Sequence, residues 1–228
     1  MIQFDIIEPM KMTTCTFCGG IADTREHIPA KQFFKGVPDK NLITVPSCSA
    51  CNKGFQKDED FFRQFYVSML LDRSPQAMQL MNNEISRSIT RTPALGLQMF
   101  GQMKMVHAYT RAGIYLGRKT MYHVSNSDRS RIDRIVKKII EGLFLHEFGE
   151  QLPKNWLIKI IWITPKVEKE QKLTDMARTL RWNVIKEDTF AYGVNFVPET
   201  FQSVWILDFF KIPLFYVLVL DKKTAKEE

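Results

Sequence analysis

The 228-residue chain contains four cysteines, which form two Cys-x-x-Cys pairs near its N-terminus: Cys15 with Cys18, and Cys48 with Cys51. A Cys-x-x-Cys turn lets two thiolates converge on one ion, and two such turns complete a tetrahedral sulfur site of the kind that Zn²⁺ favours. Such a site constrains the fold strongly, because residues 19–47 must then form a closed loop with a structure of its own. The sequence therefore predicts a zinc-bound module at the start of the chain.

Two disulfide bonds in a secreted protein are the alternative use of these four cysteines. Residues 1–12 mix charged and apolar side chains without a long apolar run, and they do not resemble a signal peptide. A chain of this length can also build a hydrophobic core without disulfide bonds. We therefore expect a structural zinc ion and reduced thiols, which suits a cytoplasmic protein.

Polar residues suited to catalysis lie within the same segment. Glu26 directly precedes His27, Asn41 lies between the two pairs, and Asn52 follows the last cysteine. At these residues the segment resembles the HNH endonucleases, the zinc-stabilised branch of the His-Me finger nucleases. The resemblance covers about the first quarter of the chain. It rests on four motifs in order: Cys15-x-x-Cys18-Gly19, Glu26-His27-Ile28-Pro29, Asn41-Leu42-Ile43 and Cys48-x-x-Cys51-Asn52.

The resemblance implies hydrolysis of phosphodiester bonds by an activated water molecule. His27 would be the general base, since a neutral imidazole can accept a proton from water near neutral pH. Glu26 and Asn52 would be oxygen ligands of one catalytic divalent cation, most simply Mg²⁺. Asn41 would orient His27 by hydrogen bonding. Members of the family leave a 5′ phosphate and a 3′ hydroxyl.

Two other functions remain open at this stage. A zinc treble clef can grip nucleic acid without cutting it, and such a binder would not need the set of Glu26, His27, Asn41 and Asn52. An RNA-cleaving effector could use the same chemistry, because the motif contacts the backbone rather than the 2′-hydroxyl. The resemblance favours a DNA endonuclease over both.

The expected fold class is α+β. The resemblance implies an N-terminal ββα-metal module of the treble-clef type, which we place in residues 1–73. The helical and strand patterns of the remainder predict an α+β region with an antiparallel sheet in residues 74–228. We expect strands at 21–28 and at 41–45, the second ended by Pro46, and then a helix that starts at the second cysteine pair. Asp58-Glu59-Asp60 reads as the solvated start of a further helix.

The larger C-terminal region shows helical and strand patterns without a catalytic motif. Ser74-Pro75 predicts a helix to about Arg91. Residues 99–124 give a mixed signal, and their Arg111, Arg118 and Lys119 suit phosphate contact. The other expected elements are a short helix at 173–180, with helices on one face of an antiparallel sheet formed by strands at 156–163, 190–196, 203–210 and 214–220.

A strongly amphipathic helix is predicted after Ser127-Asp128, which read as its cap. Its apolar face begins at Ile132, and its other positions include five basic residues. This pattern fits a helix that lies along a DNA backbone. It fits an ordinary helix with a solvated basic side equally well. The basic residues are Arg129, Arg131, Arg134, Lys137 and Lys138.

The overall charge favours an anionic partner. The formal net charge is +7 and the isoelectric point is about 9.2, so nucleic acid, most simply double-stranded DNA, is the expected partner. No apolar run reaches the length needed to span a bilayer, so no membrane association is expected. For the C-terminal region the sequence leaves DNA recognition and homodimerisation open.

Overall fold

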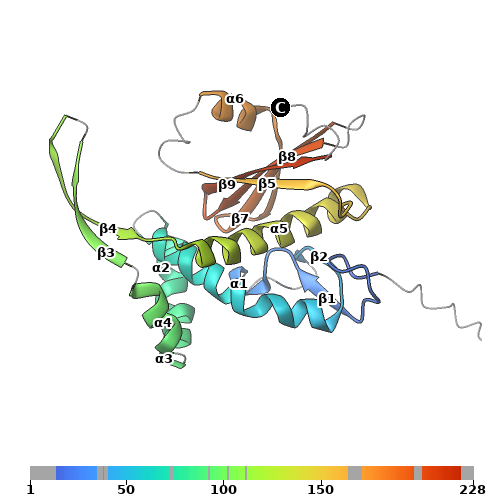
Figure 1. Ribbon diagram of the computed structural model, residues 1–228, viewed down its shortest axis with the longest axis horizontal. Helices are drawn as coiled ribbons and strands as arrows, with labels where there is room; N and C mark the ends of the chain where they lie inside the picture. Colours follow the sequence, from blue (N-terminus) through green and yellow to red (C-terminus); the bar gives the residue numbers. More distant parts are fainter. Residues whose placement is uncertain are drawn as a thin grey trace, which may run out of the picture.

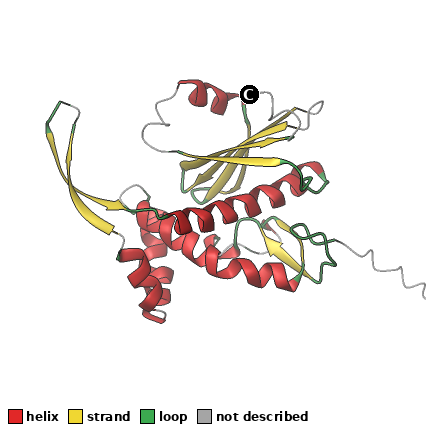
Figure 2. Cartoon of the chain, viewed as in Figure 1, coloured by secondary structure: helices red, strands yellow, loops and turns green. Residues whose placement is uncertain are grey.

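The computed structural model has a mixed α+β fold with antiparallel sheets, as the sequence predicts (Figures 1 and 2). From their mixed sequence, residues 1–12 are expected to form an edge strand or an arm, but they lie outside the described residues. The structure describes residues 14–34, 38, 41–71, 74–91, 93–101, 103–110, 112–163, 171–197 and 202–221.

Two short strands and a long helix form the N-terminal part. Strand β1 (Thr24–His27) pairs antiparallel with β2 (Thr44–Ser47), and the short 3₁₀ helix η1 (Lys31–Phe33) lies between them in the chain. Helix α1 (Ser49–Met69) follows directly. The two predicted strands are therefore present, but the first is shorter than expected and the second begins later.

Pro46 does not end β2, contrary to the expectation from sequence. It lies within the strand, opposite Arg25. The Ile28 N–H donates to the carbonyl of Ile43 at 2.9 Å, so the alternation of an antiparallel pair leaves Arg25 and Pro46 at a position where neither bonds to the other. Proline is tolerated there because its missing N–H would have pointed away from β1.

Helix α1 is one continuous helix, and the helix start predicted at Asp58-Glu59-Asp60 is wrong. The three acidic residues lie in its middle, and Glu59 is only 6% exposed rather than solvated. The aromatic residues that follow are buried as predicted, with Phe62, Phe65 and Tyr66 in the core. Acidic residues in mid-helix are explained by their partners on another helix, described below.

Several short helices and a hairpin follow. The predicted helix from Ser74 is present as α2 (Pro75–Leu80), a π-helical turn (Met81–Ile85) and α3 (Ser86–Arg91), with the Ser74 hydroxyl capping the first turn. After α4 (Pro93–Phe100), strands β3 (Met103–Tyr109) and β4 (Tyr115–Tyr122) form an antiparallel hairpin. Figure 1 shows this hairpin projecting away from the body of the protein.

Helix α5 (Asn126–Phe148) is the predicted amphipathic helix. Its cap is Ser125 rather than Ser127, and Ser125 forms a reciprocal capping box with Asp128. Gly149 ends the helix in a left-handed conformation, with φ of 72°. Within the described ranges, neither α5 nor any other helix is long and apolar enough to cross a bilayer.

The last part of the chain forms a five-stranded antiparallel sheet with the order β5-β9-β8-β7-β6. The sequence predicts the antiparallel sheet but not β6, since polar and apolar residues are mixed in this strand and none of them is fully buried. Helix α5 runs along one face, and α6 (Gln171–Thr179) lies over the other, so helices do not cover one face alone (Figure 1). The strands are β5 (Leu157–Trp162), β6 (Arg181–Lys186), β7 (Phe190–Val197), β8 (Gln202–Phe209) and β9 (Ile212–Leu220).

A single hydrophobic core connects the N-terminal part to the sheet. It includes Val45 of β2, Phe62 of α1, Leu143 of α5 and Trp205 of β8. Gly142 of α5 lies close to the N-terminal part, since a Cβ added there would clash with Cγ1 of the buried Ile28. The residue that follows the candidate base in the chain is therefore packed directly on α5.

We predict that Gly142→Ala destabilises the protein by about 1–3 kcal/mol, since the new methyl group overpacks against Ile28. The change will show as a lower midpoint in urea unfolding. Gly54→Ala is the matched control, because Gly54 is also helical but exposed, and the nearest atom to its added Cβ is 3.6 Å away. That variant should be neutral or more stable by up to about 1 kcal/mol. Equal effects of the two changes would contradict the prediction.

Candidate metal centre

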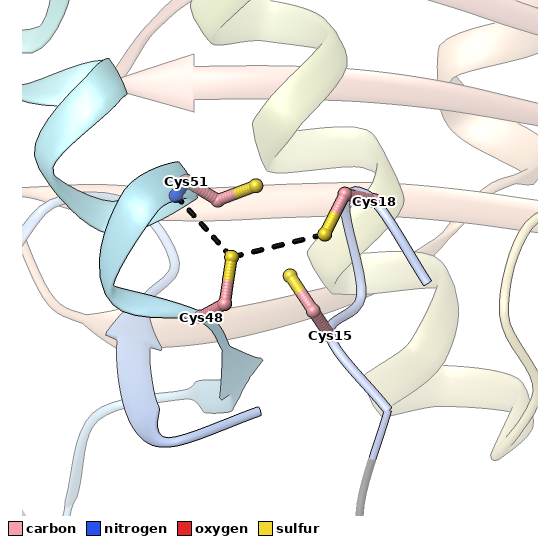
Figure 3. A group of neighbouring side chains, drawn as sticks. All are labelled: Cys15, Cys18, Cys48 and Cys51. Carbon is pink, nitrogen blue, oxygen red and sulfur yellow. Dashed lines mark hydrogen bonds between the residues drawn. The ribbon is translucent and has the colours of Figure 1, made fainter. Parts of the chain in front are cut away.

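The four cysteine side chains converge at the N-terminal end of α1 (Figure 3). Their sulfur atoms all lie within 4.8 Å of one another, and Cys18 Sγ is 3.7 Å from Cys48 Sγ. A tetrahedral Zn²⁺ with bonds of about 2.3 Å places its sulfur ligands about 3.8 Å apart. All four cysteines are free of disulfide bonds. The cluster can therefore hold a metal ion, and its geometry fits the predicted structural zinc.

The first pair is arranged by a tight turn. The Cys15 N–H donates to the Gly20 carbonyl at 2.6 Å, and the Gly19 N–H donates to the Cys15 carbonyl at 2.9 Å. Gly19 has φ of +77°, a conformation that few other residues adopt without strain. The Gly20 N–H points at Cys18 Sγ, 3.4 Å away. The Gly20 N–H therefore stabilises negative charge on the Cys18 sulfur, as a metal-bound thiolate requires.

The second pair belongs to the start of α1. Cys48 is the N-cap residue, and its Sγ accepts the Cys51 N–H at 3.4 Å. Asp23 ties this helix end to β1, since its two carboxylate oxygens accept the Ser49 N–H at 2.6 Å and the Ser49 hydroxyl at 2.7 Å. These bonds lower the pKa of Asp23. The same turn of helix thus presents two sulfur ligands and is anchored to the neighbouring strand.

The thiols of the cluster do not ionise alike. Burial raises the pKa of the Cys15 thiol, but backbone N–H donors from Cys18, Cys48 and Phe17 outweigh it and lower the pKa to about 6. Burial, followed by hydrogen bonds to the neighbouring sulfurs, raises the pKa of Cys51. Four crowded thiols therefore cannot all become thiolates without a cation, and a bound divalent ion supplies that charge.

Residues that follow α5 brace the first cysteine pair from outside. The Lys154 ammonium donates to the Cys18 carbonyl at 2.7 Å, and the Gln151 amide donates to the Thr14 hydroxyl at 2.8 Å. The metal cluster is therefore not an isolated knuckle, because the C-terminal region helps to hold its shape.

Glu26, a predicted ligand of the catalytic cation, is buried. It is 6% exposed, and its Oε1 accepts a bond from the Lys138 ammonium at 3.1 Å and from the His27 N–H at 3.0 Å. Its other oxygen, Oε2, is also buried and has no hydrogen-bond partner among the described residues. One carboxylate oxygen of Glu26 is thus paired within the protein, and the second is not.

Lys138 of α5 joins two carboxylates in the interior. Its side chain is 1% exposed and contacts Glu59 of α1 as well as Glu26 of β1. The ammonium also lies 5.2 Å from the centre of the Phe55 ring. Burial raises the pKa of Glu59; the charge of Lys138 lowers it in part, and that of Glu26 raises it further. This triad has one positive group for two acidic groups.

The other predicted site residues lie around β1. His27 is the last residue of β1 and is half-buried. Because consecutive strand residues point to opposite faces, His27 shares a face with Arg25 rather than with Glu26. Asn52, in the first turns of α1, donates from Nδ2 to the Arg25 carbonyl at 3.2 Å. Asn41 is exposed in the turn before β2, where its N–H donates to the Pro38 carbonyl at 2.9 Å.

Glu26 and His27 are thus consecutive residues of β1 that point to opposite faces, and Asn52 contacts the carbonyl of Arg25 on the same strand. A groove of about 470 Å³ lies between the metal cluster and α5, lined among others by Cys51, Phe55, Arg134 and Lys137. The three candidate catalytic residues do not line this groove.

Sequence analysis missed the buried partners of this site. The sequence pattern predicts that Lys138, like the other four basic residues of this helix, faces either DNA or solvent. Both predictions are wrong for Lys138, because its side chain is buried. Arg131 and Arg134 bind the Asp58 carboxylate at 2.7 and 2.6 Å instead of facing solvent or DNA alone. The spacing of residues on this helix could have indicated the burial of Lys138. It falls three residues after Ile135 and four before Gly142, within the apolar face.

Comparisons with known proteins do not add a family. A scan against protein-family models found no match, and searches of the curated proteins and of the solved structures found none either. The functional argument therefore depends on the residues and their geometry.

We predict that Cys48→Ser removes the metal and lowers the free energy of unfolding, because metal binding contributes to folding in a module of this kind. Metal analysis should find one Zn²⁺ per wild-type chain and less than one in the variant. Thermal unfolding with and without a chelator provides the control, since the chelator should lower the melting temperature of the wild type and leave the variant unchanged. A variant that melts like the metal-loaded wild type despite losing its metal would refute the prediction.

We predict that Lys138→Met costs about 3–5 kcal/mol at pH 8, because it leaves two buried carboxylates without their cation. Burial already raises the pKa of Glu59, and without the charge of Lys138 this pKa rises further above its unfolded value. For this variant stability is then greatest at low pH, where Glu59 is protonated, and is lost as pH rises above the ordinary glutamate pKa. Urea unfolding at a series of pH values measures this.

Glu59→Gln is the matched control for that variant. It keeps Lys138 paired with Glu26 and removes one of two negative groups, so it should cost less than Lys138→Met at every pH above the ordinary glutamate range. A Lys138→Met variant whose loss of stability does not change with pH would show that the triad is not ionised as described.

Proposed function

We propose that the protein is a metal-dependent endonuclease of the HNH class, with a ββα-metal module at its N-terminus and a structural zinc. The observation that carries the proposal is the bond from the Asn52 amide to the Arg25 carbonyl, which holds the start of α1 against the strand bearing Glu26 and His27. The strand, strand, helix order and the adjacent four-cysteine cluster support it.

Oxygen ligands for a catalytic cation are present at this position. Glu26 Oε2 is a buried carboxylate oxygen without a hydrogen-bond partner among the described residues, and a divalent ion would compensate its charge. Asn52 donates through Nδ2, so its amide oxygen remains for a ligand. A bound Mg²⁺ would neutralise charge on the phosphate and stabilise the leaving 3′ oxygen.

The protein residues then have separate tasks. His27 accepts the proton of the water that attacks phosphorus, as a neutral imidazole acting as a general base can do. Arg25, exposed on the same face of β1, suits contact with a phosphate oxygen while its guanidinium is held by Thr44 at 2.9 Å. Lys138 fixes the orientation of Glu26 from inside the protein. Asn41 is assigned, by resemblance only, to orienting His27.

A nucleic-acid-binding protein that does not cleave is the second candidate. The observation that favours it is the ion pair between Lys138 and Glu26, since a carboxylate that is already neutralised is a weaker ligand for a cation. In that case the four-cysteine module would position the chain on nucleic acid, and Glu26 would serve the fold alone.

We predict that the wild type cleaves duplex DNA with Mg²⁺ and that His27→Ala lowers the rate by about 100-fold or more, since loss of a general base costs roughly that factor. Plasmid cleavage on a gel, with a matched RNA duplex as a second substrate, measures this. His146→Ala is the matched control, because His146 is an exposed histidine of α5 outside the site. His27→Ala should retain zinc and its melting temperature.

The two candidates give different results in this assay. Binding of DNA without cleavage, by both the wild type and His27→Ala, would establish the binding protein and reject the nuclease. Faster cleavage of the RNA duplex would keep the chemistry and change the substrate.

A further inference from the structure

The positive charge of this protein is concentrated in one segment. Between Glu84 and Asp128 the sequence has no Asp or Glu, yet it has six basic residues. The whole chain has 32 Lys and Arg against 25 Asp and Glu, so the remainder has 26 against 25. Residues 85–127 thus have a formal net charge of +6 and the remainder +1. The six residues are Arg87, Arg91, Lys104, Arg111, Arg118 and Lys119.

The same segment forms the part of the molecule that projects from the core. Residues 85–127 include α3, α4 and the β3–β4 hairpin, and Figure 1 shows the hairpin extending away from the helices and the sheet. Near its base, Tyr122 packs against Phe65 of α1, with ring centres 4.7 Å apart. Lys104, Arg118 and Lys119 are all exposed along its strands. The hairpin is therefore a basic arm on a fixed base.

The arm also exposes large apolar side chains, most of them near its tip. Tyr109 is 60% exposed, Ile114 is 64% exposed, and Leu116 is likewise open to solvent. His107 and Tyr115 are joined across the strands, with His107 Nδ1 3.1 Å from the Tyr115 hydroxyl. A two-stranded hairpin without a covering layer is only marginally stable in water. This apolar surface on an exposed arm indicates a binding surface.

We propose that the β3–β4 arm binds double-stranded DNA by entering its major groove. A two-stranded ribbon with its side chains fits a groove about 12 Å wide. The basic residues of the strands then lie against the phosphates on both sides, and the apolar tip meets base edges and thymine methyl groups. The deep, narrow major groove of A-form RNA does not admit such a ribbon, so the partner is DNA.

This inference rests on the proposed function in one respect, because it identifies the surface that holds the substrate of that nuclease. It also assigns separate roles in cleavage and in binding to two parts of the protein. The residues around β1 act on the backbone, and the arm provides most of the affinity through charge. Binding should therefore depend strongly on salt, since each phosphate contact releases condensed counterions.

The test compares two triple variants in the His27→Ala background, so that cleavage cannot consume the probe. The arm variant is Lys104→Ser, Arg118→Ser and Lys119→Ser. The matched control is Lys159→Ser, Arg178→Ser and Lys211→Ser, which removes the same charge from exposed residues of β5, α6 and the turn before β9. Fluorescence anisotropy with a short duplex DNA at several salt concentrations measures affinity.

We expect the arm variant to bind DNA about 10- to 100-fold more weakly than the control variant at the same salt. The slope of log K against log salt should fall by about 2–3, close to one unit for each lost phosphate contact. Equal affinities and slopes for the two variants would overturn the proposal. Equally tight, arm-dependent binding of an RNA duplex would overturn the choice of DNA.

Other occupants of the arm give distinct results. Arm-dependent binding to phosphatidylserine vesicles, without binding to DNA, would overturn the proposal in favour of a membrane surface. An arm-dependent dimer in sedimentation, with unchanged affinity for DNA, would overturn it in favour of a second copy of the chain. If the protein that retains His27 cleaves DNA, and the arm substitutions do not change the affinity for DNA, this inference alone is rejected. Arm-dependent binding without any cleavage would reject the nuclease alone.

Discussion

One buried ammonium group holds together the three elements that build the candidate site. Lys138 of α5 reaches Glu26 of β1 and Glu59 of α1 in the interior, and its side chain is almost fully shielded from water. A charge in such a place is stable only with its partners in place, because its desolvation is otherwise uncompensated. The relative positions of β1, α1 and α5 therefore depend on this contact, as does the orientation of Glu26.

The four-cysteine cluster lies at the N-terminal end of α1, and the ion-pair triad contacts the middle of the same helix. The four cysteines bring the two ends of residues 19–47 together, while the buried Lys138 binds Glu26 of β1 within this segment. Gly142 allows α5 to approach Ile28 closely, and Lys154 braces the Cys18 turn. The C-terminal region is thus part of the scaffold for the candidate site, in addition to bearing the basic arm.

Charge in this protein has two different uses, which the total of +7 does not distinguish. On α5, Arg131, Arg134 and Lys138 bind acidic residues of α1, and Arg131 and Arg134 share Asp58. On the β3–β4 arm the basic residues have no acidic neighbours in the sequence from 85 to 127. Only charges of the second kind can attract an anionic partner at distance, because the first kind are neutralised locally.

The sequence by itself determined the four-cysteine cluster, the α+β class, the apolar face of α5 and most strands of the sheet. These follow from spacing and periodicity, which are local properties of the chain. Only the tertiary structure decided that Pro46 lies inside β2, that Asp58 and Glu59 lie in mid-helix, and that Lys138 is buried. Each depends on a partner distant in the chain: the register with β1 for Pro46, and the packing of α5 on α1 for the charged residues. Local pattern cannot contain that information, because burial of a charge is stable only where folding brings its counter-charge to it.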